Sequence, residues 1–193
     1  MFTGIIESIG IIESIAIEGT NKIFRVKSEL SHTLKIDQSV AHDGVCLTIT
    51  KIEKDSHWVT AIVETLSKTA LNTWAVGHAI NLERCLKLGD RLDGHWVQGH
   101  IDTTGICQKI TDENGSWKFD IEFHDTTNFR TVPKGSITLN GTSLTVVDSE
   151  AGKFSVAIIP YTYENTSIKH LKIGDLVNLE FDIIGKWVKE WMK

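Results

Sequence analysis

Apolar and polar side chains alternate along several short segments of the chain. Residues 117–124 alternate strictly between large apolar side chains and charged or histidine side chains, and the segments 154–158 and 176–182 alternate similarly. Successive side chains of a β-strand point to opposite faces of a sheet, so this pattern predicts half-buried strands. Turn residues separate the predicted strands, for example at Asn114-Gly115 and Asn140-Gly141.

Two short helices are predicted at the segments that begin at Thr65 and Thr162. A threonine at the start of a helix can accept hydrogen bonds from the free backbone amides of the first turn. The last residues, 184–193, place Trp187 and Trp191 at helical spacing. This apolar stripe predicts a C-terminal helix that packs either on a partner chain or on the protein's own barrel, and both alternatives stay open.

The chain repeats itself at an offset of 97 residues. Residues 39–83 align with residues 136–180 without a gap, and 13 of the 45 aligned pairs are identical. Unrelated sequences of ordinary composition would share about three identities over this length. Two residues of slippage extend the match to the start of the chain, where Gly4 corresponds to Gly99. The chain therefore contains two copies of one domain.

The elements within each copy predict the fold class. About six short strands and one small helix per copy, without a repeating strand-helix-strand order, favour a small antiparallel barrel over a nucleotide-binding α/β unit. We therefore predict an all-β protein with two tandem six-stranded antiparallel Greek-key barrels, short helices and a C-terminal helix. The predicted boundaries are 1–94 for the first barrel, 95–183 for the second barrel and 184–193 for the C-terminal helix.

Composition excludes several classes of function. The 193 residues contain 20 Lys and Arg against 25 Asp and Glu, a net charge of −5, so no overall positive field exists to bind nucleic acid. The apolar runs are short and no cleavable signal is present, so we expect a cytoplasmic protein without membrane spans. Cys46, Cys85 and Cys107 form no CxxC pair, which argues against disulfides and against a structural zinc site.

Each copy carries a small nucleophile-type side chain shortly after a turn. This side chain is Cys46 in the first copy and Ser143 in the second. If Leu47 and Leu144 point into the barrels, strand alternation sends Cys46 and Ser143 to the opposite face. The same pattern also fits an ordinary polar strand face, and the sequence shows no Ser-His-Asp arrangement of a hydrolase.

Two histidines lie at the junction between the copies. His95 and His100 are five residues apart, a spacing that matches neither one helix face nor one strand face, so no metal pair is expected. Histidine can transfer protons near neutral pH, and a hydrogen-bonded linker histidine is the alternative. Glycine-rich phosphate loops of the types GxGxxG and GxxxxGK(S/T) are absent from the sequence.

Four motifs stand in a fixed order along the chain. They are Met1-Phe2-Thr3-Gly4-Ile5-Ile6-Glu7, Asp43-Gly44-Val45-Cys46-Leu47-Thr48, Gly94-His95-Trp96-Val97-Gln98-Gly99-His100-Ile101-Asp102 and Asn140-Gly141-Thr142-Ser143-Leu144-Thr145. Together with the duplication, these motifs resemble the riboflavin synthase family of the alpha-chain type. The resemblance covers nearly the whole chain, and only the C-terminal tail lies outside it.

The resemblance implies a cofactor-independent dismutation of two molecules of 6,7-dimethyl-8-ribityllumazine. One molecule donates a four-carbon unit to the other, which gives riboflavin and 5-amino-6-ribitylamino-uracil. The family also implies a homotrimer with each site between the first barrel of one chain and the second barrel of a neighbour, and an association with lumazine synthase. The alternative is a non-catalytic antenna of the lumazine-protein type, which binds lumazine or flavin on the same duplicated fold.

The resemblance further implies the residues of the sites. The implied catalytic residues are Ser143, Cys46, His100, His95 and Asp182. The first substrate pocket is expected to use Gly4, Ile5, Ile6, Cys46, Leu47, Thr48, Ile62, Val63, Glu64 and Thr65. The second substrate pocket is expected to use Gly99, His100, Ile101, Ser143, Leu144, Thr145, Ala157, Ile158, Ile159, Pro160, Tyr161 and Thr162, with Lys134 nearby.

The two turns depart from the family pattern. This chain has Asp43 before the glycine of the first turn and Asn140 before that of the second, whereas the family commonly has the reverse. The exchange leaves open which turn supplies a carboxylate. Asp182 or Glu180 could replace an acid that is missing at Asn140.

Overall fold

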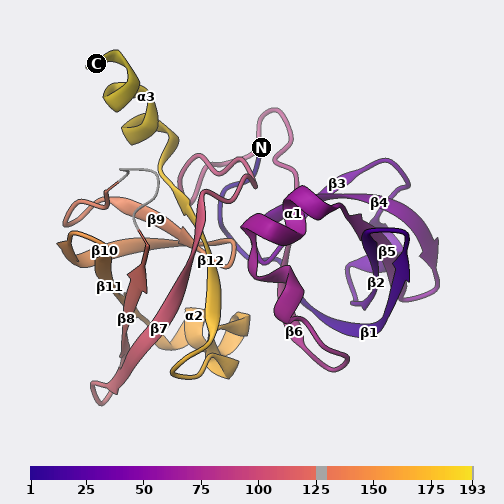
Figure 1. Ribbon diagram of the computed structural model, residues 1–193, viewed down its shortest axis with the longest axis horizontal. Coiled ribbons are helices and arrows are strands. Elements are labelled where there is room, and N and C mark those ends of the chain that lie inside the picture. The colour runs from indigo at the N-terminus through magenta and orange to yellow at the C-terminus, as the bar shows by residue number, and fades with distance from the viewer. Residues whose placement is uncertain (125–129, 193) are drawn as a thin grey trace.

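The computed structural model describes residues 1–124 and 130–192, whose strands form two closed barrels (Figure 1). The first barrel closes in the order β1-β2-β5-β4-β3-β6, and every neighbouring pair is antiparallel. β3 pairs with β4 and β6 rather than with β2, which is the crossing connection of a Greek key. The strands are β1 (Ser8–Glu18), β2 (Asn21–Lys27), β3 (Ser39–His42), β4 (Val45–Glu53), β5 (Ser56–Ala61) and β6 (Ala79–Arg84).

The second barrel repeats the first strand by strand. It closes in the order β10-β11-β8-β7-β12-β9, which is the same cyclic order as in the first barrel. The prediction of two tandem six-stranded antiparallel barrels is confirmed. The strands are β7 (Thr103–Asp112), β8 (Trp117–Phe123), β9 (Ser136–Leu139), β10 (Thr142–Glu150), β11 (Lys153–Ile158) and β12 (Leu176–Phe181).

Each barrel has its own apolar core. In the first barrel, Phe24 and Trp74 pack edge to face, with ring centroids 5.0 Å apart. In the second barrel, Phe119, Ile121 and Phe123 are buried on one face of β8, as the alternation predicted. Full burial of one such side chain contributes about 1.5–3 kcal/mol to the stability of the fold.

The starts of the two short helices differ from the prediction. α1 (Val63–Lys68) and α2 (Pro160–Asn165) begin two residues before Thr65 and Thr162, so the hydroxyls of these threonines do not cap them. An isoleucine in extended conformation precedes each helix and provides no side-chain cap. The proline at the first position of α2 suits a helix start, because an amide hydrogen there would have no partner within the helix.

Threonine caps occur one helix later in each copy. Thr69 accepts a hydrogen bond from Leu71 N, and Thr166 accepts one from Ile168 N, both at 3.4 Å. They begin the 3-10 helices η2 (Ala70–Thr73) and η3 (Ser167–His170). The third 3-10 helix is η1 (Ser31–Thr33).

The two copies exchange hydrogen bonds across the seam between the barrels. Asn81 Nδ2 donates to Asn140 O at 2.8 Å, and Asn178 Nδ2 donates to Asp43 O at 2.9 Å. The amide oxygens of Asn81 and Asn178 accept backbone amides of the opposite barrel at 2.6 and 2.7 Å. Both asparagines are almost fully buried, so their paired amides fix the orientation of one barrel against the other.

The start of the chain and the junction between the copies run side by side at this seam. Phe2 and Val97 exchange backbone hydrogen bonds of 2.7 and 3.2 Å. Glu83 accepts two backbone amides at the start of the chain, at 2.7 and 3.0 Å. Glu180 accepts three backbone amides of the junction, at 2.6, 2.9 and 3.1 Å. The buried Glu83 of the first barrel therefore anchors the start of the chain, and the buried Glu180 of the second barrel anchors the junction.

The predicted C-terminal helix is α3 (Ile183–Trp191), which projects from the second barrel (Figure 1). Asp182 Oδ1 caps it by accepting a hydrogen bond from Ile184 N at 2.9 Å. Trp187 and Trp191 lie with ring centroids 5.8 Å apart and are 55% and 78% exposed, so the fold leaves much of this apolar stripe uncovered. No helix in the described residues is long and apolar enough to span a membrane.

Candidate functional site

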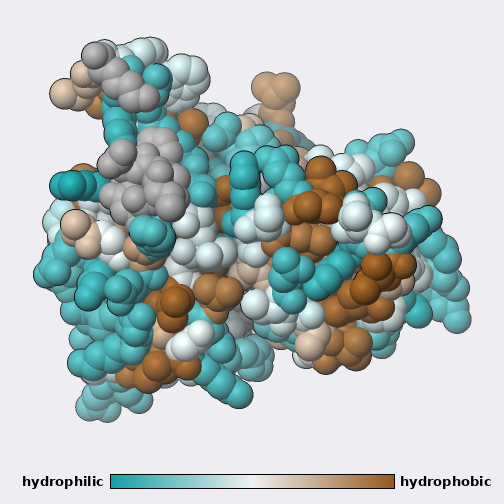
Figure 2. All heavy atoms as spheres, viewed as in Figure 1, coloured by the Kyte–Doolittle hydropathy of each residue, from teal (hydrophilic) through white to brown (hydrophobic). Residues whose placement is uncertain are grey.

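The first cluster of predicted site residues lies at one end of the first barrel. Leu47 is buried in β4, while Cys46 and Thr48 lie on the outer face of that strand, as alternation predicted. β4 pairs with β5, and the end of β5 leads through Ile62 into α1. Ile62 is about half exposed, and hydrophobic residues gather on the surface around α1 (Figure 2). The predicted strand segment therefore lies on a strand that neighbours the strand leading into the predicted helix segment.

The second cluster has the same construction in the second barrel. Leu144 is buried in β10, and Ser143 and Thr145 lie on its outer face. β10 pairs with β11, which ends at Ile158 just before α2. Tyr161 in the first turn of α2 is 76% exposed. Both clusters therefore expose apolar surface next to a polar strand face.

Each cluster takes its glycine from the other copy. Gly4 O accepts a hydrogen bond from Ser143 N at 2.8 Å, and Gly99 O accepts one from Cys46 N at 2.9 Å. A Cβ atom at Gly4 would lie 2.6 Å from Ser143 Cβ, and one at Gly99 would lie 2.7 Å from Cys46 Cβ. Ile101 likewise packs against the core of the first barrel. We expected Gly4 to lie with Cys46 and Gly99 to lie with Ser143. These contacts show the opposite pairing, because the segments that carry Gly4 and Gly99 cross between the barrels.

His95 contacts both Ser143 and a residue that the sequence analysis did not single out. His95 Nδ1 lies 2.7 Å from Ser143 Oγ, and His95 Nε2 lies 3.1 Å from Thr138 Oγ1. The imidazole is only 8% exposed. Burial lowers the pKa of His95, and the negative charge of Asp182 opposes this shift. The ring is therefore neutral at neutral pH, with one donor nitrogen and one acceptor nitrogen.

The other predicted catalytic side chains have different surroundings. His100 is exposed, and its backbone amide donates to Glu180. Lys134 is exposed and precedes β9 with a φ of +68°. Within the described residues, no hydrogen bond joins either side chain to Ser143 or Cys46. Glu180 and Asp182, the two substitutes considered for a missing acid, both accept backbone amides.

Cys46 is a protonated thiol at neutral pH. It is half-buried, and burial raises its pKa above the ordinary value of 9.0. The nearby groups of Cys85 and Glu180 raise the pKa further, although hydrogen bonding to Ser39 opposes them. A reactive cysteine needs a lowered pKa, so these surroundings do not favour Cys46 as a nucleophile.

Asp43 lies in the seam between the barrels. It is almost fully buried, and its Oδ1 accepts hydrogen bonds from Asn81 N at 2.8 Å and Ser167 Oγ at 3.4 Å. Burial raises the pKa of Asp43 to about 7. Asn140 Oδ1 accepts a hydrogen bond from Asn178 N at 2.7 Å in the equivalent way. The shared role is to accept a backbone amide, which both Asp and Asn can do.

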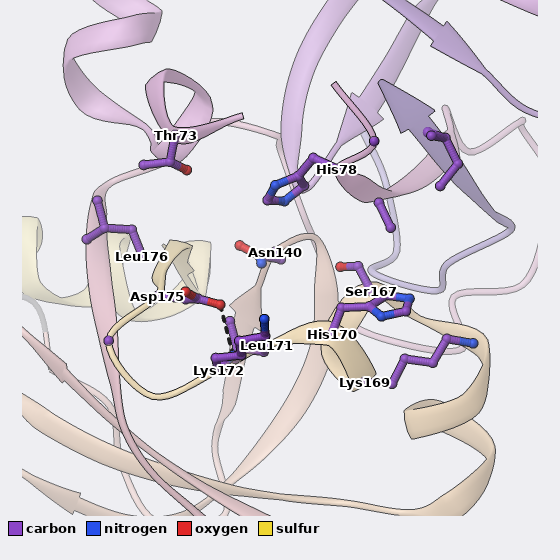
Figure 3. Close-up of a pocket in the computed structure, with 14 residues that line it drawn as sticks. Thr73, His78, Asn140, Ser167, Lys169, His170, Leu171, Lys172, Asp175 and Leu176 are labelled. Carbon is purple, nitrogen blue, oxygen red and sulfur yellow. Dashed lines mark hydrogen bonds between the residues drawn. The ribbon is translucent and has the colours of Figure 1, made fainter. Parts of the chain in front are cut away.

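A cavity of about 850 Å³ lies at the seam and contains none of the predicted site residues (Figure 3). Segments 73–79 of the first copy and 167–176 of the second line it, and His78 projects into it opposite Asp175. A smaller cavity of about 500 Å³ is lined by the start of the chain and the end of β6, and it includes the predicted site residue Ile5. Over the described part of the chain, no group of three or more His, Cys, Asp or Glu side chains is arranged to hold a metal ion.

Both copies of the duplicated domain match the same protein-family model. The family model described as "Lumazine binding domain" matches residues 3–85 and 98–182. The chain belongs to the lumazine-binding family. Both clusters fall within the matched ranges, so each lumazine-binding domain of the chain carries one of them.

Proteins named riboflavin synthase match the entire chain. Riboflavin synthase of Actinobacillus pleuropneumoniae is 37% identical, and riboflavin synthase of Bacillus subtilis (strain 168) is 34% identical; each match covers 100% of this chain and 90% of the relative. A solved structure titled "Crystal structure of LumP complexed with riboflavin" has a TM-score of 0.87 at 21% identity, covering 93% of this chain and 98% of that chain. At this identity the likeness to LumP supports the fold alone.

Sequence reasoning missed several residues that organise the site. Glu83 was not singled out and Glu180 was considered only as a substitute acid, yet both anchor the crossing segments, and Asn81 and Asn178 join the barrels. The identical Asn-Leu-Glu triplet in the two copies was the signal that could have found them. Thr138 gave no such signal, because the first copy has an alanine at the equivalent position.

Proposed function

We propose that this protein is a riboflavin synthase. It converts two molecules of 6,7-dimethyl-8-ribityllumazine into riboflavin and 5-amino-6-ribitylamino-uracil by transfer of a four-carbon unit, without a cofactor. The observation that carries this proposal is the full-length match to proteins named riboflavin synthase at 34% and 37% identity. The duplication supports it, because a reaction between two identical substrates needs two similar sites.

Each cluster offers a site for one substrate molecule. The strands β4 and β10 offer polar groups next to the crossing glycine segments, and the pyrimidinedione ring can pair with such groups. The first-turn amides of α1 and α2 lack partners within their helices and are further donors. The exposed apolar side chains Ile62 and Tyr161 can cover the rest of each ring system. Holding two rings in a stacked arrangement would supply most of the rate acceleration.

The proposed reaction begins with loss of a proton from the acidic methyl group on carbon seven. We assign proton transfer or orientation to His100 and His95, and contact with the activated ring carbon to Ser143 and Cys46. The 2.7 Å contact between His95 and Ser143 supports a joint role for this pair. Asp182 would act through its charge on His95.

A cytoplasmic homotrimer is the assembly that we propose. Each site would lie between the first barrel of one chain and the second barrel of a neighbour. The exposed tryptophans of α3 and the exposed apolar side chains at both clusters support this arrangement, because a neighbouring chain would cover them. An association with lumazine synthase would place the source of the substrate beside its consumer.

The second candidate function is a non-catalytic antenna that binds lumazine or flavin, because LumP, which was solved in complex with riboflavin, has the same fold. One experiment separates the two functions. Purified protein is incubated with 6,7-dimethyl-8-ribityllumazine and no added cofactor, and products are separated by chromatography. The proposal predicts riboflavin and the pyrimidine co-product in equal amounts. Tight binding of the lumazine without product would instead establish the antenna.

A further inference from the structure

Ser143, Thr138 and Glu180 form one row on the outer face of the second barrel. Ser143 in β10 pairs directly with Thr138 in β9, which pairs with Glu180 in β12. Side chains of directly paired residues in antiparallel strands point to the same face. His95 bridges the first two members of the row, so two hydroxyl groups contact the two nitrogens of one imidazole.

The protons of this chain of hydrogen bonds can be placed by matching donors to acceptors. The neutral ring of His95 has one donor nitrogen and one acceptor nitrogen. Thr138 is fully buried, and within the described residues its hydroxyl has His95 Nε2 as its hydrogen-bond partner. A proton on Nε2 would leave the hydroxyl hydrogen of Thr138 buried without an acceptor, at a large desolvation cost. A proton on Nδ1 avoids this cost, because Thr138 can then donate to Nε2.

We propose that Thr138 is a positioning residue that holds His95 in the tautomer protonated at Nδ1. His95 then donates to Ser143 Oγ, and the hydroxyl hydrogen of Ser143 is free to point toward the substrate. Ser143 therefore serves as a hydrogen-bond donor rather than as a nucleophile that is deprotonated by His95. The role toward substrate rests on the proposed function, whereas the tautomer does not.

The first barrel has a different row at the equivalent positions. Cys46, Ala41 and Glu83 pair in the same order across β4, β3 and β6. Ala41 has no hydroxyl, and Cys46 has a thiol in place of the serine hydroxyl. The duplicated scaffold thus gives its two clusters different hydrogen-bond donors. This difference allows the two clusters to form different hydrogen bonds with two identical substrate molecules.

The tautomer can be measured on the protein without substrate. ¹⁵N NMR of histidine-labelled protein reports which ring nitrogen is protonated, and a His95→Gln variant identifies the His95 signals. Wild type is expected to carry the proton on Nδ1 at pH 7. Thr138→Val keeps the shape of the side chain and removes the donor, so the preference for Nδ1 should be lost. Thr138→Ser should restore it. A wild-type proton on Nε2, or an unchanged preference in Thr138→Val, would overturn the proposal.

Turnover gives the second readout. Thr138→Val is expected to lower kcat about tenfold with little change in KM. The variant loses the one hydrogen bond that orients His95, and the free energy of one such bond corresponds to about this factor in rate. Thr138→Ser should stay close to wild type, and so should Thr111→Val in β7, the control outside both clusters. Wild-type kcat in a folded Thr138→Val variant would contradict the positioning role. An inactive wild type with the expected tautomer would contradict the proposed function and leave the tautomer assignment standing.

Discussion

At the scale of single residues, the first barrel buries a polar pair where the second barrel is apolar. His42 Nε2 lies 2.9 Å from His57 Nε2, and His57 Nδ1 lies 2.8 Å from Ser31 Oγ. All three residues are fully buried. The second copy has Leu139 and Phe154 in place of the two histidines. Burial lowers the pKa of His42 to about 3 and that of His57 to about 4.

This pair makes the stability of the first barrel depend on pH. Both pKa values lie below the ordinary 6.5, so the unfolded chain binds more protons than the folded chain once the pH falls below 6.5. The contribution of the two neutral histidines to the stability of the fold is therefore fully present above pH 6.5, and it is lost as the pH falls toward 4. A variant with His42→Leu, His57→Phe and Ser31→Ala should lose roughly 5 kcal/mol less stability than wild type between pH 7.5 and pH 4.5, because each of the two histidines costs about 1.4 kcal/mol per pH unit below 6.5.

Urea unfolding at the two pH values, followed by tryptophan fluorescence, measures this difference. Trp58 and Trp74 report on the first barrel. A variant that loses as much stability on acidification as wild type would contradict the assignment of the acid sensitivity to this pair.

Alternation along the strands could predict which residues face outward at each cluster. Leu47 and Leu144 point inward, while Cys46 and Ser143 point outward. This could be predicted because side chains alternate between the two faces of any β-strand, whatever the tertiary structure. The partner of His95 could not be predicted in this way. Thr138 occupies a fully buried strand position, and only the placement of the junction segment beside β9 brings His95 to it.

At the scale of elements, the two tight turns of the seam depend on glycine. A Cβ atom at Gly44 would lie 2.7 Å from Gly141 N, and one at Gly141 would lie 2.7 Å from Gly44 N. Both glycines also have a positive φ, at +81° and +79°. The turns therefore need glycine both for their conformation and for the close approach of the two barrels.

Replacing Gly44 by alanine should destabilise the protein more than an ordinary turn glycine would. We expect Gly44→Ala to cost roughly 3 kcal/mol, because backbone strain adds to an overlap with a backbone atom. Gly19→Ala is the matched control: Gly19 has a φ of +60° but no atom near its Cβ position, so only about 1 kcal/mol should be lost. Equal losses of unfolding free energy in urea titrations of the two variants would contradict a tightly packed seam.

The helix starts show where local sequence signals were insufficient. Thr65 and Thr162 are good capping residues, but each helix begins two residues earlier, directly after β5 or β11 ends. The end of the barrel strand sets the start of the helix there, and capping preference is the weaker effect. Thr69 and Thr166 do act as caps, but of the 3-10 helices η2 and η3, so the predicted threonine caps of the two short helices were wrong.

At the scale of the whole molecule, the repeat could predict two barrels but not how they meet. Two copies aligned at one offset show which residues are equivalent, for example Asn81 and Asn178. The exchange of their amides across the seam depends on the relative orientation of the barrels, which no alignment of the copies contains. The crossing of Gly4 and Gly99 between the clusters was missed for the same reason.

The exposed stripe of α3 leads to a prediction about assembly. Removal of residues 183–193 should convert the proposed trimer into smaller species and should lower activity at least tenfold, since each site would need a neighbouring chain. Trp191→Ser should weaken the assembly, whereas Leu88→Ser, which removes an even more exposed apolar side chain from a loop, should not. Light scattering after size-exclusion chromatography measures the mass. A truncated chain that keeps both its mass and its activity would exclude α3 from the assembly.

The central claim is that each barrel holds one molecule of the same substrate. The direct measurement is an equilibrium titration with a lumazine analogue that carries oxygen in place of the methyl group on carbon seven and therefore cannot react. We expect two molecules bound per chain in wild type. Thr48→Trp and Thr145→Trp, which fill the outer strand faces of the first and second clusters, should each reduce this number to one. A single molecule bound per wild-type chain would contradict the account.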